Sequence, residues 1–360
     1  MKAPAVAQIA IVAALAQHSA YLYRANTGAA NELLAVFNKD TKALLASLAE
    51  QLEDLTDAER MALASASYST ARLKAIKATV DDWYKSLTAT LPEVFTAGAV
   101  ALAGHEVNYI TEAMAMATGD AKDIALTGEK VFKSAKKLPV TGGQLIDQMF
   151  SKIAVQAQDT VWNTIRQGVV DGQSNSEIIK ALRGKAEFKY QDSVLAPTRQ
   201  AIETEVRTAR NHISNNAYME TYAALGVEEV VVVATLDSKV SVQCAARDGT
   251  RYKINENFPR PPYHRRCRTV IAPVFDKDLI GNRPAKGSDG TTQVNANTTF
   301  SSWFKNQSAE FQKDWLGESR YKLYKTGGYE LSRFVDPKGQ TYTLDELKIR
   351  DKRTFSEVFG

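Results

Sequence analysis

One stretch of the chain, residues 244–269, reads CAARDGTRYKINENFPRPPYHRRCRT and is the most informative part of the sequence about fold and function. It holds both cysteines of the protein, Cys244 and Cys267, together with His264. These residues come from the two ends of a loop that contains Pro261 and Pro262. Because the ends of such a loop can converge, we expect the three side chains to cluster in one loop-and-strand unit.

Thiolate and neutral imidazole are common zinc ligands, and a closed structural zinc site has four of them. The stretch offers three evident ligands, and Asp248 or His212 could be the fourth, although neither follows from spacing. A second interpretation is a pair of buried thiols beside a histidine that is hydrogen-bonded to backbone. A third is a disulfide between Cys244 and Cys267, which a reducing cytosol disfavours. We favour the second interpretation and expect no cofactor, with zinc as the less favoured alternative.

The same stretch is strongly basic. Its seven Lys and Arg side chains face two acidic ones, an excess larger than the net charge of +4 of the whole chain. The arginines are Arg247, Arg251, Arg260, Arg265, Arg266 and Arg268. Such a cluster can contact phosphates without reading sequence, and it can equally face a protein partner. The arginines can also pair with carboxylates elsewhere, such as Glu203, Glu205, Glu228 and Glu229.

The segment before this stretch, residues 1–184, reads as one helix after another. Apolar residues recur every three or four positions, which is the spacing of one helix face. The clearest stripe, which Pro92 is expected to end, is Leu73, Ile76, Val80, Trp83 and Leu87. Two capping-box pairs, Thr56 with Glu59 and Ser174 with Glu177, predict new helix starts. We predict a helical arm over residues 1–184 that docks on other proteins.

A different pattern follows residue 184. A further helix is predicted over residues 202–225, and the β-branched run at 230–233 indicates a buried strand. Asp248-Gly249 is a hairpin turn signal, and residues 269–274 form a second candidate strand. Residues 276–299 are rich in Gly, Asn, Ser and Thr and read as a linker. The aromatic residues of 300–360 are enough for a small C-terminal module.

The predicted fold class is therefore mainly α with a small α+β module. We divide the chain into the helical arm (1–184), an α+β core with the Cys/His/Arg motif (185–275), the linker (276–299) and the C-terminal module (300–360). The length of 360 residues agrees with two or three domains.

Composition excludes several classes of protein. With 44% hydrophobic and 24% charged residues, the chain is an ordinary globular protein. No run of eighteen or more apolar residues occurs, so no membrane span is expected. The four histidines, His18, His105, His212 and His264, fall in no recognised catalytic spacing. We therefore expect no enzymatic activity and assign no catalytic residue.

Four pieces of the sequence resemble the Mu-type phage head morphogenesis family of minor head, or minor capsid, proteins. They lie at 165–184, at 204–237, at 244–268 and in the tail from Trp303 to Leu347. The most specific is the third, in which Asp248-Gly249 is followed by PPYHRRCR at 261–268. Members of this family often carry further cysteines where Ser241 and Thr269 stand here, which argues against a family-type metal site in this chain.

The resemblance implies a structural role. Such proteins enter the procapsid in few copies, lie inside the head near the portal vertex, and are associated with DNA packaging or ejection. The implied partners are the phage portal protein, the major capsid protein, packaged DNA bound without sequence preference, and further copies of the chain. The implied location is the interior of the phage head, after assembly in the host cytoplasm. Two alternatives are an effector carried in the head and delivered with the DNA, and a non-viral DNA-binding module.

Overall fold

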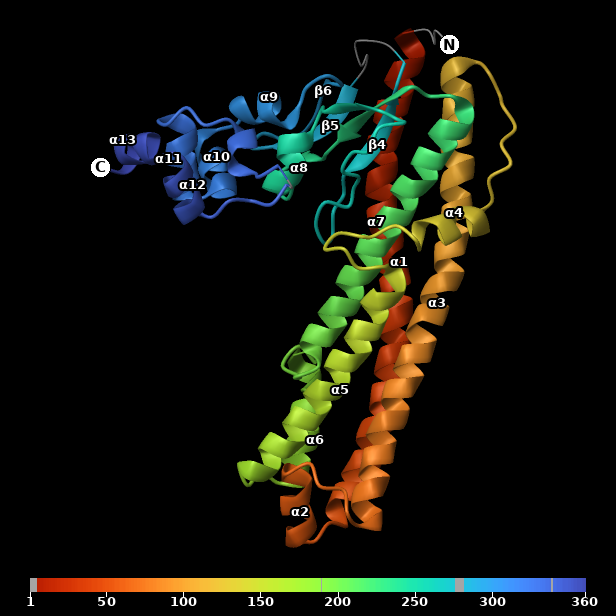
Figure 1. The fold of residues 1–360 in the computed structure, drawn as a ribbon, viewed down its shortest axis with the longest axis vertical. Helices are drawn as coiled ribbons and strands as arrows, with labels where there is room; N and C mark the ends of the chain where they lie inside the picture. Colours follow the sequence, from red (N-terminus) through yellow and green to blue (C-terminus); the bar gives the residue numbers. More distant parts are fainter. Residues whose placement is uncertain (1–4, 189, 276–281, 338) are drawn as a thin grey trace. The chain divides into compact units, whose positions relative to one another are not determined.

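The computed structural model describes residues 5–188, 190–275, 282–337 and 339–360 (Figure 1). By its internal contacts, the chain divides into two units. Unit 1 takes its described residues from 1–24, 100–135 and 210–360, and unit 2 takes them from 25–99 and 136–209. This grouping differs from the division at residues 184, 275 and 299, which stays a prediction from the sequence.

Unit 2 is helical, as the sequence predicts. It contains the later part of α1 (Ala5–Glu53), α2 (Asp57–Ala64), the first part of α3 (Ala71–Thr118), α5 (Ile146–Val170), α6 (Asn175–Arg183), the 3₁₀ turn η1 (Ala186–Phe188) and the first part of α7 (Ala196–Leu225). Both predicted capping boxes form, at Thr56 with Glu59 and at Ser174 with Glu177. The predicted apolar stripe of α3 is buried.

α3 does not end at Pro92, so that prediction is wrong. A proline in a helix interior costs about 3 kcal/mol. The apolar stripe continues beyond the proline, however, with Phe95 and Leu102, which are 3% and 5% exposed. Burying a Leu or Phe side chain stabilises by roughly 1.5–3 kcal/mol. The packing beyond the proline therefore outweighs its cost.

α3 is also the one helix, among the described residues, that is long and apolar enough to cross a membrane. Its most apolar window has a mean hydropathy of 1.3, whereas the lack of a continuous run of eighteen apolar residues predicts no membrane-spanning helix. Core helices of soluble proteins meet the same criterion of length and composition. The window is therefore weak support for a membrane span.

In unit 1, a small antiparallel sheet packs against helices. Its central strand β1 (Glu229–Val233) lies between β3 (Arg251–Lys253) and β4 (Val270–Val274). The two strands expected at 230–233 and 269–274 are thus confirmed. The core of this sheet includes Ile11 of α1, Ile110 of α3 and Tyr218 of α7. The unit also contains α4 (Gly128–Ala135).

A second sheet occupies part of the expected linker. β2 (Leu236–Asp237) pairs in parallel with β5 (Asn282–Gly287), which forms a hairpin with β6 (Gly290–Asn295). The prediction of a linker is therefore wrong for residues 282–295, while residues 276–281 lie outside the described residues. Most side chains of β6 are exposed, so the hairpin lacks the apolar pattern that marks a buried strand.

Short helices complete unit 1. They are α8 (Val242–Arg247), α9 (Phe300–Lys305), α10 (Ala309–Leu316), α11 (Glu318–Lys325), the 3₁₀ turn η2 (Leu331–Phe334), α12 (Leu344–Arg350) and α13 (Lys352–Phe359). Phe300 and Phe304 share one hydrophobic core with Leu236, Cys244 and Cys267. The C-terminal helices are thus packed on the loop between β3 and β4, residues 254–269, here called the motif loop. The predicted fold class, mainly α with a small α+β module, is confirmed.

Asp248-Gly249 is not a hairpin turn, because it links helix α8 to strand β3. The Asp248 carboxylate is buried and accepts two hydrogen bonds from the Arg283 guanidinium, at 3.0 and 3.2 Å. It also accepts the backbone N–H groups of Ala234 and Phe300, both at 2.7 Å. Gly249 has a φ of +82°, and a Cβ there would lie 2.7 Å from Thr299 Cγ2. The Asp-Gly pair therefore joins the end of β1, strand β5 and the start of α9.

We predict that Asp248→Ala lowers the free energy of unfolding by about 3–5 kcal/mol, because it leaves the guanidinium of Arg283 buried without its charge partner. Urea unfolding of the full-length protein measures this change. The control is Glu229→Ala, which breaks the Arg251–Glu229 pair, whose side chains are 29% and 41% exposed. An exposed pair of this kind is worth about 1 kcal/mol or less. Equal losses of stability in the two variants would contradict a special role for Asp248.

Candidate functional site

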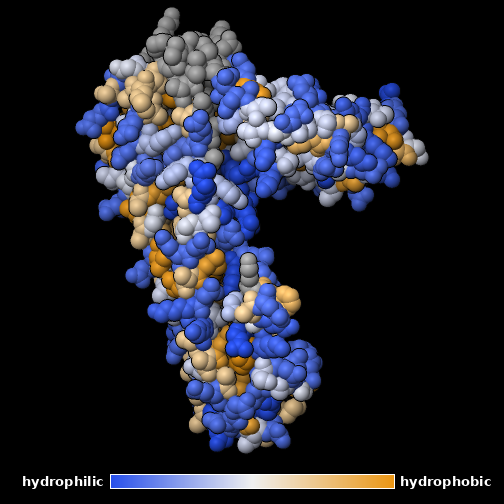
Figure 2. Space-filling view, turned by 180° about the vertical axis from the view of Figure 1, so that it is seen from behind, coloured by the Kyte–Doolittle hydropathy of each residue, from blue (hydrophilic) through white to orange (hydrophobic). Residues whose placement is uncertain are grey.

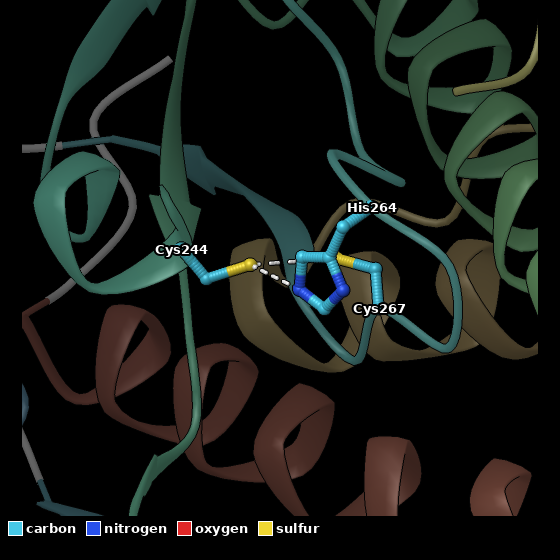
Figure 3. Close-up of side chains that lie close together, drawn as sticks. All are labelled: Cys244, His264 and Cys267. Atoms are coloured by element: carbon cyan, nitrogen blue, oxygen red, sulfur yellow. Dashed lines mark hydrogen bonds between the residues drawn. The ribbon is translucent and has the colours of Figure 1, made fainter. Parts of the chain in front are cut away.

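Cys244, His264 and Cys267 meet at one point (Figure 3). Cys244 lies in the first turn of α8, which Ser241 caps, and the other two lie in the loop between β3 and β4. The sulfur of Cys244 is 3.1 Å from His264 Nε2 and 3.6 Å from the sulfur of Cys267. Both cysteines are buried and free, and the histidine is half-buried. The structure thus brings together the three residues that the sequence singles out.

The two cysteines of the cluster differ in pKa. His264 Nδ1 donates to the Arg265 carbonyl at 2.7 Å, so Nε2 is the atom that faces the sulfurs. Burial raises the pKa of Cys267, but hydrogen bonds from Cys244 and His264 outweigh it and leave this pKa well below its usual range. The hydrogen bond to Cys267, together with burial, raises the pKa of Cys244 well above its usual range. The arrangement favours a thiolate at Cys267 and a thiol at Cys244.

The histidine completes this charge balance. Burial lowers the pKa of His264, but the hydrogen bond and the charge of Cys267 reverse that effect and leave the pKa raised. A raised pKa on the imidazole and a lowered one on the sulfur are the mark of an ion pair between them. A thiolate beside a cationic imidazole is the reactive form of cysteine. Here, however, the sulfur of Cys267 is buried, and the residue is 4% exposed.

The same three atoms fit a zinc ion as ligands. Zinc takes sulfur at about 2.3 Å and histidine nitrogen at about 2.0–2.1 Å, and the separations of 3.1 and 3.6 Å allow all three to reach one ion. Neither suggested fourth ligand is available. Asp248 is bonded to Arg283, and His212 Nε2 donates to the Ala135 carbonyl at 3.0 Å. The donor set is therefore two sulfurs and one imidazole, with one position open.

Two arginines of the basic cluster are paired with carboxylates. Arg268 makes a two-pronged contact with Asp237, at 2.6 and 2.8 Å. Arg251 lies 3.5 Å from Glu229, which is one of the four carboxylates considered from the sequence. The two contacts tie β3, which precedes the motif loop, and the end of that loop to β1 and β2. Each guanidinium therefore has a carboxylate partner within the chain.

Two further arginines lie over aromatic rings. The guanidinium of Arg247 is 4.6 Å from the ring centre of Tyr263, and that of Arg260 is 5.4 Å from the ring centre of Phe258. A guanidinium over an aromatic face gains about 0.5–1 kcal/mol at exposed sites. These contacts orient the two side chains, and an aromatic ring does not cancel the charge of a guanidinium.

Arg265 and Arg266 form an exposed turn of the loop between β3 and β4, here called the loop tip, and Arg260 of the same loop is exposed as well. Arg266 has a φ of +60°, a left-handed conformation that is uncommon for residues other than glycine. Strained backbone of this kind gathers at functional sites. The loop therefore exposes positive charge at these two adjacent positions.

Comparison with known proteins agrees with the motifs. The model of the family described as Phage Mu protein F like protein matches residues 159–272. These residues form a Phage Mu protein F-like segment. The match spans α7, the central strand, and the whole cysteine–histidine loop. No curated protein and no solved structure matches the chain.

The family match confirms the resemblance to the Mu-type head morphogenesis family over this segment. The match covers 114 of the 360 residues, so it assigns the resemblance to this segment and not to the whole chain. The matched residues stop before Arg283, which completes the buried pair with Asp248. Sequence analysis missed this partner because Arg283 lies in the stretch that reads as a linker and carries no pattern of its own.

We predict that His264→Ala raises the pKa of Cys267 toward the usual cysteine value of about 8.5, because the cationic imidazole is removed. Thiolate absorbance, titrated against pH in full-length protein treated with EDTA, measures the change. Wild type should keep one thiolate at neutral pH, and the variant should lose it. His105→Ala, at an exposed histidine outside the cluster, serves as control. Loss of the wild-type thiolate on EDTA treatment alone would show that a metal, and not His264, maintains it.

Proposed function

We propose that this chain is a minor head protein of a bacteriophage, located inside the capsid near the portal vertex, where it assists head assembly and DNA packaging or ejection. The observation that carries the proposal is the family match over residues 159–272. The match coincides with the segment that carries Asp248 and the cysteine–histidine cluster. Such a rigid, internally bonded module suits a protein whose role is structural.

The proposal includes no enzymatic activity and no cofactor at the cysteine–histidine cluster. Its support is the burial of the two sulfurs, since Cys244 is 1% and Cys267 is 4% exposed. A nucleophile must reach its substrate, and these atoms are enclosed by the hydrophobic core that includes Phe300 and Leu236. The cluster then serves to fix the loop that carries Arg265 and Arg266.

The proposed DNA contact is the tip of that loop. Packaged DNA presents closely spaced phosphates, and exposed arginines attract them without reading bases. Arg265 and Arg266 are both exposed and adjacent, while Arg247 and Arg260 lie over rings nearby in the sequence. This surface is suited to weak contact with DNA of any sequence.

The proposed contact with other head proteins lies on unit 2. Figure 2 shows apolar residues interrupting the otherwise hydrophilic surface of the chain. Among the exposed large apolar side chains are Phe188, Tyr190 and Val194, in the connection between α6 and α7. Exposed apolar residues gathered in one segment often mark a protein-binding surface. The partners we propose are the portal protein, the major capsid protein or a second copy of the chain.

If the proposal is right, the chain will be found in purified heads in few copies. Protease added to intact heads should leave it undigested, because the shell excludes the enzyme, and should digest it once the heads are opened. Quantitative mass spectrometry of treated and untreated heads measures both results. The major capsid protein serves as the internal standard for copy number. Digestion in intact heads would contradict an interior location, and absence from heads would contradict the proposal as a whole.

The DNA contact predicts weak binding to two unrelated duplexes with equal affinity and a steep loss of affinity as salt rises. Arg265→Ala combined with Arg266→Ala should weaken both complexes equally and reduce the slope of log K against log salt by roughly 2, about 0.9 for each phosphate that the variant no longer neutralises. A salt titration of binding measures the slope.

The matched control for this experiment is the double variant Lys352→Ala and Arg353→Ala, which removes two exposed positive charges elsewhere in unit 1. It should leave the slope nearly unchanged. No binding of wild type at low salt would remove the DNA contact from the proposal, while the structural role would remain.

A further inference from the structure

A second cluster of metal-ligand residues lies within unit 1, away from the motif loop. It consists of His18 on α1 and of His105 and Glu106 on α3. The Glu106 side chain is 0% exposed, and its two oxygens lie 2.9 and 3.1 Å from His18 Nε2. A fully buried carboxylate is costly unless it is paired and hydrogen-bonded. No sequence pattern indicates this cluster, because His18 and Glu106 are 88 residues apart.

His105 lies near Glu106 but makes no hydrogen bond with it. Its Nε2 lies 4.0 Å from Glu106 Oε1, which is too long for a hydrogen bond. Two atoms that bind one zinc ion at about 2.0–2.2 Å each can be as much as about 4 Å apart. The ligand atoms of His18, His105 and Glu106 all lie within 4.8 Å of one another. A modest rotation of the exposed His105 side chain therefore brings all three atoms onto one ion.

The two buried ligands are already held in place by outer contacts, as metal ligands usually are. Tyr218 donates its hydroxyl proton to Glu106 Oε2, and Oε1 is the oxygen that lies nearest to both histidines. The Tyr109 ring stacks on the His18 ring at 3.7 Å with an angle of 10° between the planes. The Tyr109 hydroxyl in turn donates to the Ala14 carbonyl at 3.0 Å. These contacts fix the orientation of the carboxylate and of one imidazole.

We propose that His18, His105 and Glu106 bind a divalent transition-metal ion, with zinc as the ion that suits two imidazoles and one carboxylate. His105, whose side chain is 53% exposed, gives the ion a path from solvent and leaves a fourth position for water. Binding displaces to solvent the proton that His18 Nε2 shares with Glu106. The ion cross-links α1 and α3 in unit 1. This site is independent of the proposed role in the phage head.

Cobalt(II) is the probe for this site, because its absorption reports the ligands. Full-length protein freed of metal with EDTA is titrated with cobalt(II), and zinc is then added in competition. A site of imidazole and carboxylate gives visible d–d bands without the near-ultraviolet charge-transfer band of a cobalt–thiolate bond. We expect d–d bands in wild type, and an affinity lower by at least roughly tenfold in His105→Ala, since even loss of an outer-shell partner costs that much.

His105→Ala suits this test because the side chain is exposed and its loss leaves no buried charge behind. The control, His264→Ala, removes the imidazole of the cysteine cluster and should leave the d–d bands unchanged. Thermal unfolding provides a second readout, in which zinc raises the midpoint for wild type and His264→Ala but not for His105→Ala. Absence of cobalt binding, binding that persists in His105→Ala, or binding that shows only a thiolate band would each overturn the proposal.

Discussion

The buried contact between Asp248 and Arg283 is the interaction on which the motif region depends. Removing two charges from water costs several kcal/mol for each ion, and their attraction repays it only when further hydrogen bonds satisfy both groups. Here the carboxylate also accepts the N–H groups of Ala234 and Phe300, and the guanidinium also donates to the Thr298 carbonyl. One contact therefore holds together the end of β1, the hairpin strand β5 and the start of α9. The helix that precedes Asp248 carries Cys244, so the same contact sets where that sulfur lies.

The interior and the surface of this module carry different side chains. Inside, the sulfurs of Cys244 and Cys267 share one core with the aromatic residues of the C-terminal helices. Outside, the same loop presents Arg265 and Arg266 to solvent. The family match ends at residue 272, so the segment that it recognises is completed by residues beyond it. The hairpin and the C-terminal helices are thus structural parts of the module, because they supply Arg283 and the hydrophobic cover.

Local patterns in the sequence predicted the features that depend on neighbouring residues. Helix faces, capping boxes and the buried run of valines follow from periodicity and burial, and the cysteine–histidine cluster follows from one short loop. Prediction failed where contacts between residues far apart in the sequence determine the structure. Packing carries α3 through Pro92, the hairpin at 282–295 has largely polar strands, and Asp248 finds its partner 35 residues away. The pairing of His18 with Glu106 belongs to the same class, because only the packing of α1 on α3 brings them together.

The central claim is that this chain is an internal component of a phage head, with the motif loop turned toward DNA. An asymmetric reconstruction of the portal vertex of DNA-filled heads, imaged by electron cryomicroscopy, tests it most directly. The account predicts density for the long helices and for the sheet of β1, β3 and β4 on the inner side of the shell at that vertex. The loop tip at Arg265 and Arg266 should face the packaged DNA. Density for the chain on the outer surface, or a loop tip buried against protein and away from DNA, would contradict the account.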